Sequence, residues 1–107
     1  MAYNEKLGER IRKSIGKNKH VTERHMFGGL SFLYKKKMFC GVLKDELVLK
    51  ISHEQWEKAL QEPNVRPMDF TGRPMKGFVY VNQKGCNSDK DLKKWVQLSM
   101  DHVMHST

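Results

Sequence analysis

The fold is decided by residues 26–51, which read MFGGLSFLYKKKMFCGVLKDELVLKI. Short polar segments divide this stretch into three β-type runs: Met26 to Tyr34, Met38 to Leu43 and Leu47 to Ile51. Alternate side chains of a strand share one face, so Met38, Cys40 and Val42 are expected together on a covered face. The stretch therefore predicts three antiparallel strands joined by two tight hairpins.

Helical periodicity lies on both sides of these strands. Apolar residues recur at every fourth position from Tyr3 to Ile15, and Gly16 then provides a stop, which predicts an amphipathic first helix. The run Ser52-His53-Glu54-Gln55 has capping-box spacing and begins a short helix. A last helix is expected after Ser88, with these residues on its buried side: Leu92, Trp95, Val96, Ser99 and Val103.

Between the last two helices, residues 67–81 read as a second hairpin with its turn at Thr71-Gly72-Arg73-Pro74. The predicted order is therefore α-β3-α-β2-α. Consecutive hairpins do not make a parallel sheet, so this order predicts a two-layer α+β fold. In it, helices pack on one face of an antiparallel five-stranded sheet. The length suits a single domain spanning residues 1–107.

Composition excludes several classes of protein. A balance of 38% hydrophobic and 30% charged residues is that of a globular chain, and no apolar run is long enough to span a bilayer. The first residues lack the apolar run of a secretory signal. Cys40 and Cys86 stand outside any zinc-binding or disulfide-framework spacing. We therefore expect a cytoplasmic protein with reduced thiols, no metal, no cofactor and no membrane contact.

Residues 24–32 carry a Met-Phe-Gly-Gly motif formed by Met26, Phe27, Gly28 and Gly29. This motif, with further matches in 38–42, 47–50, 66–81 and 88–95, resembles the signature of the TfoX N-terminal domain family, named for regulators of natural competence in bacteria. The resemblance is to the stand-alone branch of that family. It implies a fold similar to that of type III secretion chaperones. It also implies a module that acts through protein contacts in bacterial transcriptional control, as a partner of a DNA-bound activator.

The two glycines of this motif have two interpretations. Glycine tolerates close approaches and backbone conformations that other residues resist, so Gly28 and Gly29 are able to hold a backbone open for a ligand. A pair of glycines in a strand more often marks a bulge where the strand bends, and we favour that interpretation. Neither a dinucleotide-binding nor a P-loop glycine pattern is present.

A candidate interaction or anion-binding patch lies in the second hairpin, where Arg66, Arg73 and Lys76 bracket Asp69. Guanidinium groups there are suited to a carboxylate or phosphate from a ligand or partner. The simpler interpretation is that Asp69 pairs with one of the arginines and fixes the turn.

The net charge of +8 suggests a second candidate surface. The first helix carries Lys6, Arg10, Lys13 and Lys17, and Lys19 and the lysines at 35–37 add to this basic character. Such a surface suits nucleic acid or another acidic partner. A solvated lysine-rich surface is the simpler interpretation, because no DNA-binding motif is recognisable.

No catalytic constellation is recognisable in the sequence. Cys40 reads as a buried structural cysteine, whereas Cys86, in a polar turn, is expected to be exposed. His102 and His105 have a spacing that can serve a metal, but without a third ligand nearby they read as surface histidines.

These observations favour a regulatory or protein-interaction module that is not an enzyme. Two alternatives stay open: sequence-independent nucleic-acid binding by the basic first helix, and sensing of, or enzymatic action on, a small anion at the 66–76 hairpin. The sequence also permits a homodimer, since a two-layer domain leaves its second sheet face in need of cover.

Overall fold

The computed structural model describes residues 3–26, 28–67 and 77–105. Within them the helices and strands follow one another in this order: α1 (Glu5–Ile15), β1 (Val21–Met26), β2 (Gly29–Tyr34), β3 (Lys37–Leu43), β4 (Glu46–Lys50), α2 (His53–Ala59), β5 (Val65–Pro67), β6 (Phe78–Val81), the 3₁₀ helix η1 (Gln83–Cys86) and α3 (Asp89–His105).

The described strands form one antiparallel sheet in the order β1-β2-β3-β4-β6-β5. The α+β class is therefore confirmed, but the sheet has six strands rather than five, and four of them precede α2 rather than three. The additional strand is β1. Its residues from Thr22 to His25 are exposed and largely polar, so they lack the apolar alternation by which a strand is recognised in sequence.

The expected single strand from Met26 to Tyr34 is instead divided between two strands, because β1 ends at Met26 and β2 begins at Gly29. Phe27 lies outside the described residues. Met26 pairs with Gly29, and Gly28 has a φ of 79°, a left-handed conformation that favours glycine. A Cβ added to Gly29 would lie 2.3 Å from the carbonyl oxygen of Val42 on β3. The glycine pair therefore forms the β1–β2 turn and a close strand contact, not the expected bulge.

An irregularity between β2 and β3 changes which side chains reach the core. Phe32 pairs with Cys40 but Leu33 pairs with Met38, so Phe39 is an extra residue in β3. Phe39 is fully buried in the main core, whereas Met38 packs on the other side of the sheet beside Val48. The expectation that Met38 shares a face with Cys40 is wrong for this reason.

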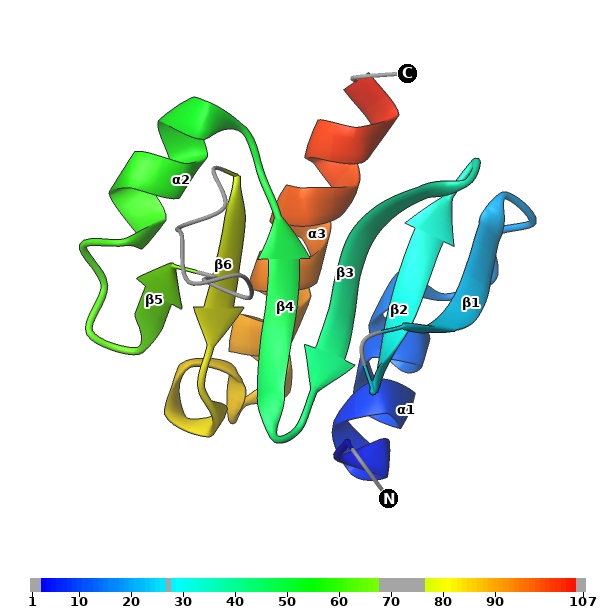
Figure 1. Cartoon of the computed structure of the whole chain (residues 1–107), viewed down its shortest axis with the longest axis horizontal. Helices are drawn as coiled ribbons and strands as arrows, with labels where there is room; N and C mark the ends of the chain where they lie inside the picture. The colour runs from blue at the N-terminus through cyan, green and yellow to red at the C-terminus, as the bar shows by residue number, and fades with distance from the viewer. Residues whose placement is uncertain (1–2, 27, 68–76, 106–107) are drawn as a thin grey trace.

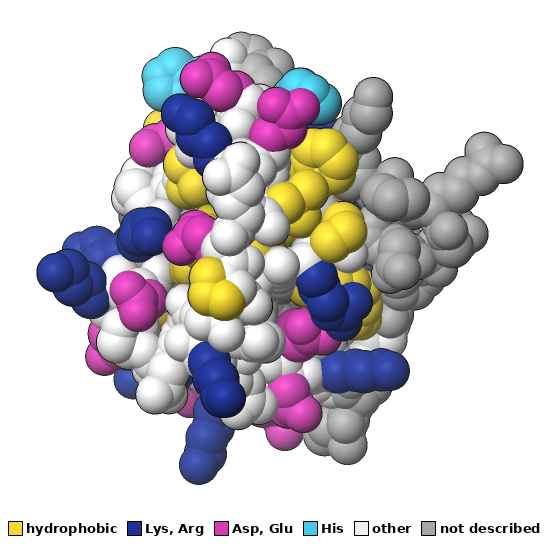
Figure 2. Space-filling model, turned by 90° about the vertical axis from the view of Figure 1, so that its left-hand side faces the viewer, with side chains coloured by type: hydrophobic (Ala, Val, Ile, Leu, Met, Phe, Trp, Pro, Cys, Tyr) yellow, Lys and Arg dark blue, Asp and Glu magenta, His cyan; other side chains and the backbone are white. Residues whose placement is uncertain are grey.

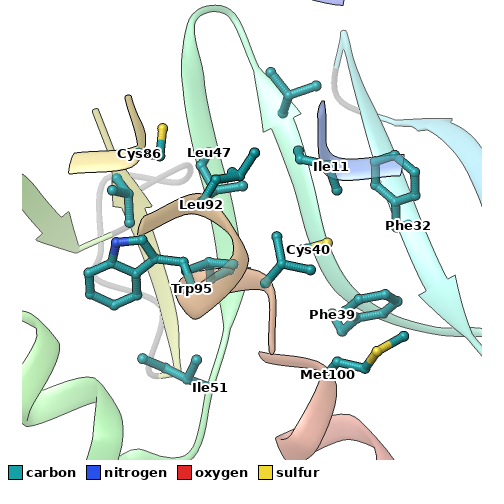
Figure 3. Packing of buried hydrophobic residues seen from close by; sticks show 14 of the residues in the cluster. Ile11, Phe32, Phe39, Cys40, Leu47, Ile51, Cys86, Leu92, Trp95 and Met100 are labelled. Atoms are coloured by element: carbon teal, nitrogen blue, oxygen red, sulfur yellow. The ribbon is translucent and has the colours of Figure 1, made fainter. Parts of the chain in front are cut away.

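Helices α1 and α3 lie side by side against one face of the sheet, and α2 lies beside its β6 end (Figure 1). Figure 3 shows side chains from α1, the sheet and α3 converging on one cluster, which includes Ile11, Phe39, Leu47 and Trp95. This cluster is the main core of the domain, and burying it against the sheet is the dominant favourable contribution to folding.

The predicted helix ends are confirmed by their caps. Gly16 follows α1 with a φ of 73°, and the hydroxyl of Ser52 accepts from the backbone N–H of Gln55 at 3.2 Å. The hydroxyl of Ser88 accepts from the N–H of Asp91 at 3.1 Å, at the start of α3. Asn4, which the sequence analysis did not single out, caps α1 by accepting from Leu7.

The polar turn predicted after β6 contains η1, and this helix buries Cys86 in the core. The expectation of an exposed Cys86 is therefore wrong. A second hairpin partner for β6 is present as the short strand β5, while the turn predicted at 71–74 lies outside the described residues. In the part of the chain that the structure describes, no helix has the length and apolarity needed to cross a membrane.

Candidate functional site

A cleft of about 390 Å³ separates α2 from α3. It is lined from α2 and the turn that follows by Gln55, Lys58, Ala59 and Glu62, and from α3 by Lys94, Trp95, Gln97, Leu98 and Asp101. Ala59 and Trp95 are buried and Leu98 is half-buried, so the floor of the cleft is apolar. A hollow of this volume is large enough for one or two bulky side chains of a partner.

Hydrogen bonding fixes the floor of the cleft. The indole Nε1 of Trp95 donates to the carbonyl oxygen of Gly85 at 3.1 Å, so the polar end of the ring is satisfied inside the domain. The Nζ of Lys94 lies 5.1 Å from the centre of the Trp95 ring. The hydrogen bond to Gly85 turns the polar end of Trp95 into the domain, so the part of this buried side chain that lines the cleft is apolar.

The rim of the cleft carries charges of both signs: Lys58, Glu62, Lys94 and Asp101. All four are exposed. Figure 2, drawn from the α2 side, shows hydrophobic side chains gathered among lysines, arginines and carboxylates. An apolar centre surrounded by mixed polar groups is the usual organisation of a protein–protein interface.

Sequence reasoning missed this cleft, although one signal was available. Leu98 lies outside the apolar stripe of α3 formed by Leu92, Val96 and Val103, and an apolar residue away from the core-facing stripe is a hint of a second contact surface. The other half of the cleft comes from α2, and periodicity within one helix does not reveal which helix lies beside it.

The basic surface proposed on the first helix is only partly as expected. One face of α1 carries Lys6, Arg10 and Lys13, because successive members of this set are four and three residues apart along the helix. Lys17 lies beyond the Gly16 cap and is therefore not on the helix. Lys6, Lys13 and Lys17 are exposed.

Arg10 is engaged within the domain rather than free. Its Nη2 donates to the carbonyl oxygens of Cys86 at 3.0 Å and Asn87 at 2.9 Å, and it lies 3.3 Å from a carboxylate oxygen of Asp89. These contacts tie α1 to the start of α3 across more than seventy residues of sequence. We call them the Arg10 latch.

Of the four residues of the candidate patch in the second hairpin, the structure describes only Arg66. The Arg66 guanidinium forms a bidentate pair with Glu46 of β4 and lies 4.2 Å from the ring centre of Tyr80 on β6. Asp69, Arg73 and Lys76 lie outside the described residues. Arg66 is thus held on the sheet by a partner that sequence spacing did not indicate.

The thiols lie in surroundings that suppress reactivity. Burial raises the pKa of the Cys40 thiol well above its usual value, and burial also raises that of Cys86, so both are protonated at neutral pH. Burial and then the charge of Lys50 lower the pKa of His102. Among the described residues, no three or more His, Cys, Asp or Glu side chains are grouped so as to hold a metal ion.

A comparison with known families decides the assignment. The model of the TfoX N-terminal domain matches residues 13–103, from the second half of α1 to near the end of α3. The chain belongs to this family. Within the TfoX N-terminal domain seen here, Gly28 lies between β1 and β2 with a positive φ, and Gly29 begins β2 close to the backbone of β3. No curated protein and no solved structure shows significant similarity to the sequence.

Proposed function

We propose that this TfoX N-terminal domain is a non-enzymatic regulatory module that binds another protein through the cleft between α2 and α3. Family membership supports a competence-related regulatory role. The observation that carries the proposal is the cleft itself, whose floor of Ala59, Trp95 and Leu98 is apolar and whose rim bears both charges.

The occupant that suits this cleft is an amphipathic helix of a protein partner. Two neighbouring helices leave a groove in which the side-chain ridge of a third helix can lie. One bulky apolar side chain of the partner would contact Trp95, and flanking residues of both charges would face Lys58 and Glu62 on one side and Lys94 and Asp101 on the other. Burying such an anchor contributes about 1.5–3 kcal/mol, and anchors of this kind dominate interface energetics.

A regulatory role without catalysis agrees with the chemistry of the described residues. Cys40 is fully buried, and that burial raises the pKa of its thiol. We accordingly place the action of the domain in the bacterial cytoplasm, in a complex with a regulatory protein.

The proposal is tested by affinity capture from the cytosol of the native cells with three baits. The wild type is compared with Leu98→Glu, which places a charge in the cleft. The control is Met104→Glu, the same kind of change on the same helix outside the cleft. We expect a protein that is captured by the wild type and by Met104→Glu but lost with Leu98→Glu.

A captured candidate is then tested with purified components. In a Trp56→Phe background Trp95 is the single tryptophan, so occupation of the cleft should change its fluorescence with a saturable dependence on partner concentration. Equal capture by the two variants would move the binding site away from the cleft. The absence of any reproducible partner would contradict the proposal as a whole.

A further inference from the structure

We propose that a basic ridge binds the phosphate backbone of duplex nucleic acid. The ridge is defined here as Lys6 and Lys13 of α1 with Lys93 of α3, and Arg10 positions these lysines through its contacts within the domain. The ridge is separate from the α2–α3 cleft, because the hollows beside the ridge have no lining residue in common with the cleft. The two activities therefore do not compete for the same surface.

The geometry of the ridge follows from helix spacing and from the Arg10 latch. Lys6 and Lys13 are seven residues apart on one helix face, a separation of about 10 Å at 1.5 Å per residue. One strand of a B-form duplex carries a charge about every 3.4 Å along its axis, so this length spans about three phosphates. The latch holds the start of α3 beside α1, which brings Lys93 to the same hollow as Lys13.

Hollows lie on both sides of the latch. One, of about 350 Å³, is lined by Arg10, Lys13, Ser14, Asp89 and Lys93. The other, of about 200 Å³, is lined by Asn4, Lys6, Leu7, Arg10, Gln83, Cys86 and Asn87. Each has at least one lysine in its lining, Lys6 in the smaller hollow and Lys13 and Lys93 in the larger. An ammonium group in this position suits a phosphate that keeps part of its hydration.

The lysines of the ridge are available for a partner. Lys6, Lys13 and Lys93 are exposed, and within the described residues none of them forms an ion pair. The carboxylate of Asp89, which lines the larger hollow, pairs with Arg10 rather than with a lysine. The charge of these lysines is therefore not neutralised inside the domain.

The observations favour a duplex over a single strand. Proteins that bind single strands stack bases on exposed aromatic side chains. Among the described residues, neither hollow is lined by an aromatic side chain, and the aromatic residue Phe39 is fully buried in the core. A row of lysines without such a platform contacts backbone and carries no sequence information.

The experiment is a fluorescence anisotropy titration of a labelled duplex of random sequence. It is done at about 50, 100 and 200 mM salt, because the fall in affinity over this range reports the number of phosphate contacts. The variants are Lys13→Gln and Lys93→Gln, and the control is Lys58→Gln on α2, which changes the net charge equally. Removing one phosphate contact should weaken binding about fivefold at the middle salt concentration and reduce the salt slope by about 1.

Two results together would support the ridge. The affinity of the wild type should fall with salt, and Lys13→Gln and Lys93→Gln should weaken binding whereas Lys58→Gln should not. Equal loss in all three variants would mean that only the net charge matters, and the proposal would be wrong. No wild-type binding at the lowest salt concentration would overturn it too, as would equal displacement of the duplex by polyglutamate. The proposal would also be wrong if the protein bound a single strand more tightly than the duplex and Lys13→Gln left that affinity unchanged, since nucleic acid would then bind outside the ridge.

Discussion

The Arg10 latch should contribute more to stability than any other charged side chain on α1. Arg10→Met keeps most of the aliphatic stem but removes the donors to Cys86 and Asn87 and the ion pair with Asp89. The bond to the partly buried carbonyl of Cys86 comes from a charged donor and is worth about 1.5–3 kcal/mol. The solvent-exposed pair with Asp89 adds about 0–1 kcal/mol.

We therefore expect Arg10→Met to lower the free energy of unfolding by about 2–3 kcal/mol, which corresponds to a fall in Tm on the order of 10 °C for a domain of this size. Urea unfolding followed by circular dichroism gives the free energy, with an m-value like that of the wild type. Arg12→Met is the matched control, because its partner Glu23 lies at the surface and the pair is worth only about 0.5 kcal/mol. If the two variants lose the same stability, the latch does not hold α1 to α3 in the way that we describe.

Three further predictions concern the sheet and its neighbours. Phe39→Ala should lower the unfolding free energy by about 3–5 kcal/mol and Met38→Ala by only about 1 kcal/mol, since only Phe39 is fully buried; similar losses in urea unfolding would contradict the irregularity in β3. Gly41→Ala should cost about 2 kcal/mol or more, because the new Cβ would lie 2.4 Å from the Leu30 carbonyl oxygen; a variant as stable as the wild type in thermal unfolding would rule out that close approach. Arg12 lowers the pKa of Glu23 by hydrogen bonding, so the pair stabilises the domain above the ordinary carboxyl pKa and stops doing so as pH falls through the lowered value. Glu23→Gln should thus be about 0.5 kcal/mol less stable than the wild type at pH 7, and a difference that persists at pH 2 would refute this account.

Local signals in the sequence were sufficient for the helices and for most of the sheet. The first helix ends at Gly16 and the second begins at Ser52 as predicted, because a cap depends on a few adjacent residues. The hairpins at 35–36 and 44–45 are likewise found where charged residues interrupt apolar runs. The apolar face of α3 is confirmed from Leu92 to Val103.

Features that depend on distant parts of the chain were not predictable. Strand β1 is an edge strand whose polar residues resemble a loop, and the extra residue Phe39 exists only relative to its neighbouring strand. Arg10 and Arg66 are two of the candidate site residues whose contacts the structure describes. Their partners at Asn87 and Glu46 belong to other elements, so spacing along the chain gave no indication of them.

The position of α3 after all the described strands in the chain affects how the domain folds during its synthesis on the ribosome. Each of the four strands before α2 pairs with the next one in sequence, so these pairings can form as the strands emerge. Strand β4 also pairs with β6, which is synthesised later. Helix α1 can cover part of the apolar face of the strands before α2, but the rest stays uncovered until α3 has been synthesised, because α3 supplies Leu92, Trp95 and Met100 to the core. A nascent chain arrested before this helix would expose the hydrophobic side of its sheet, a surface that chaperones bind and that promotes aggregation.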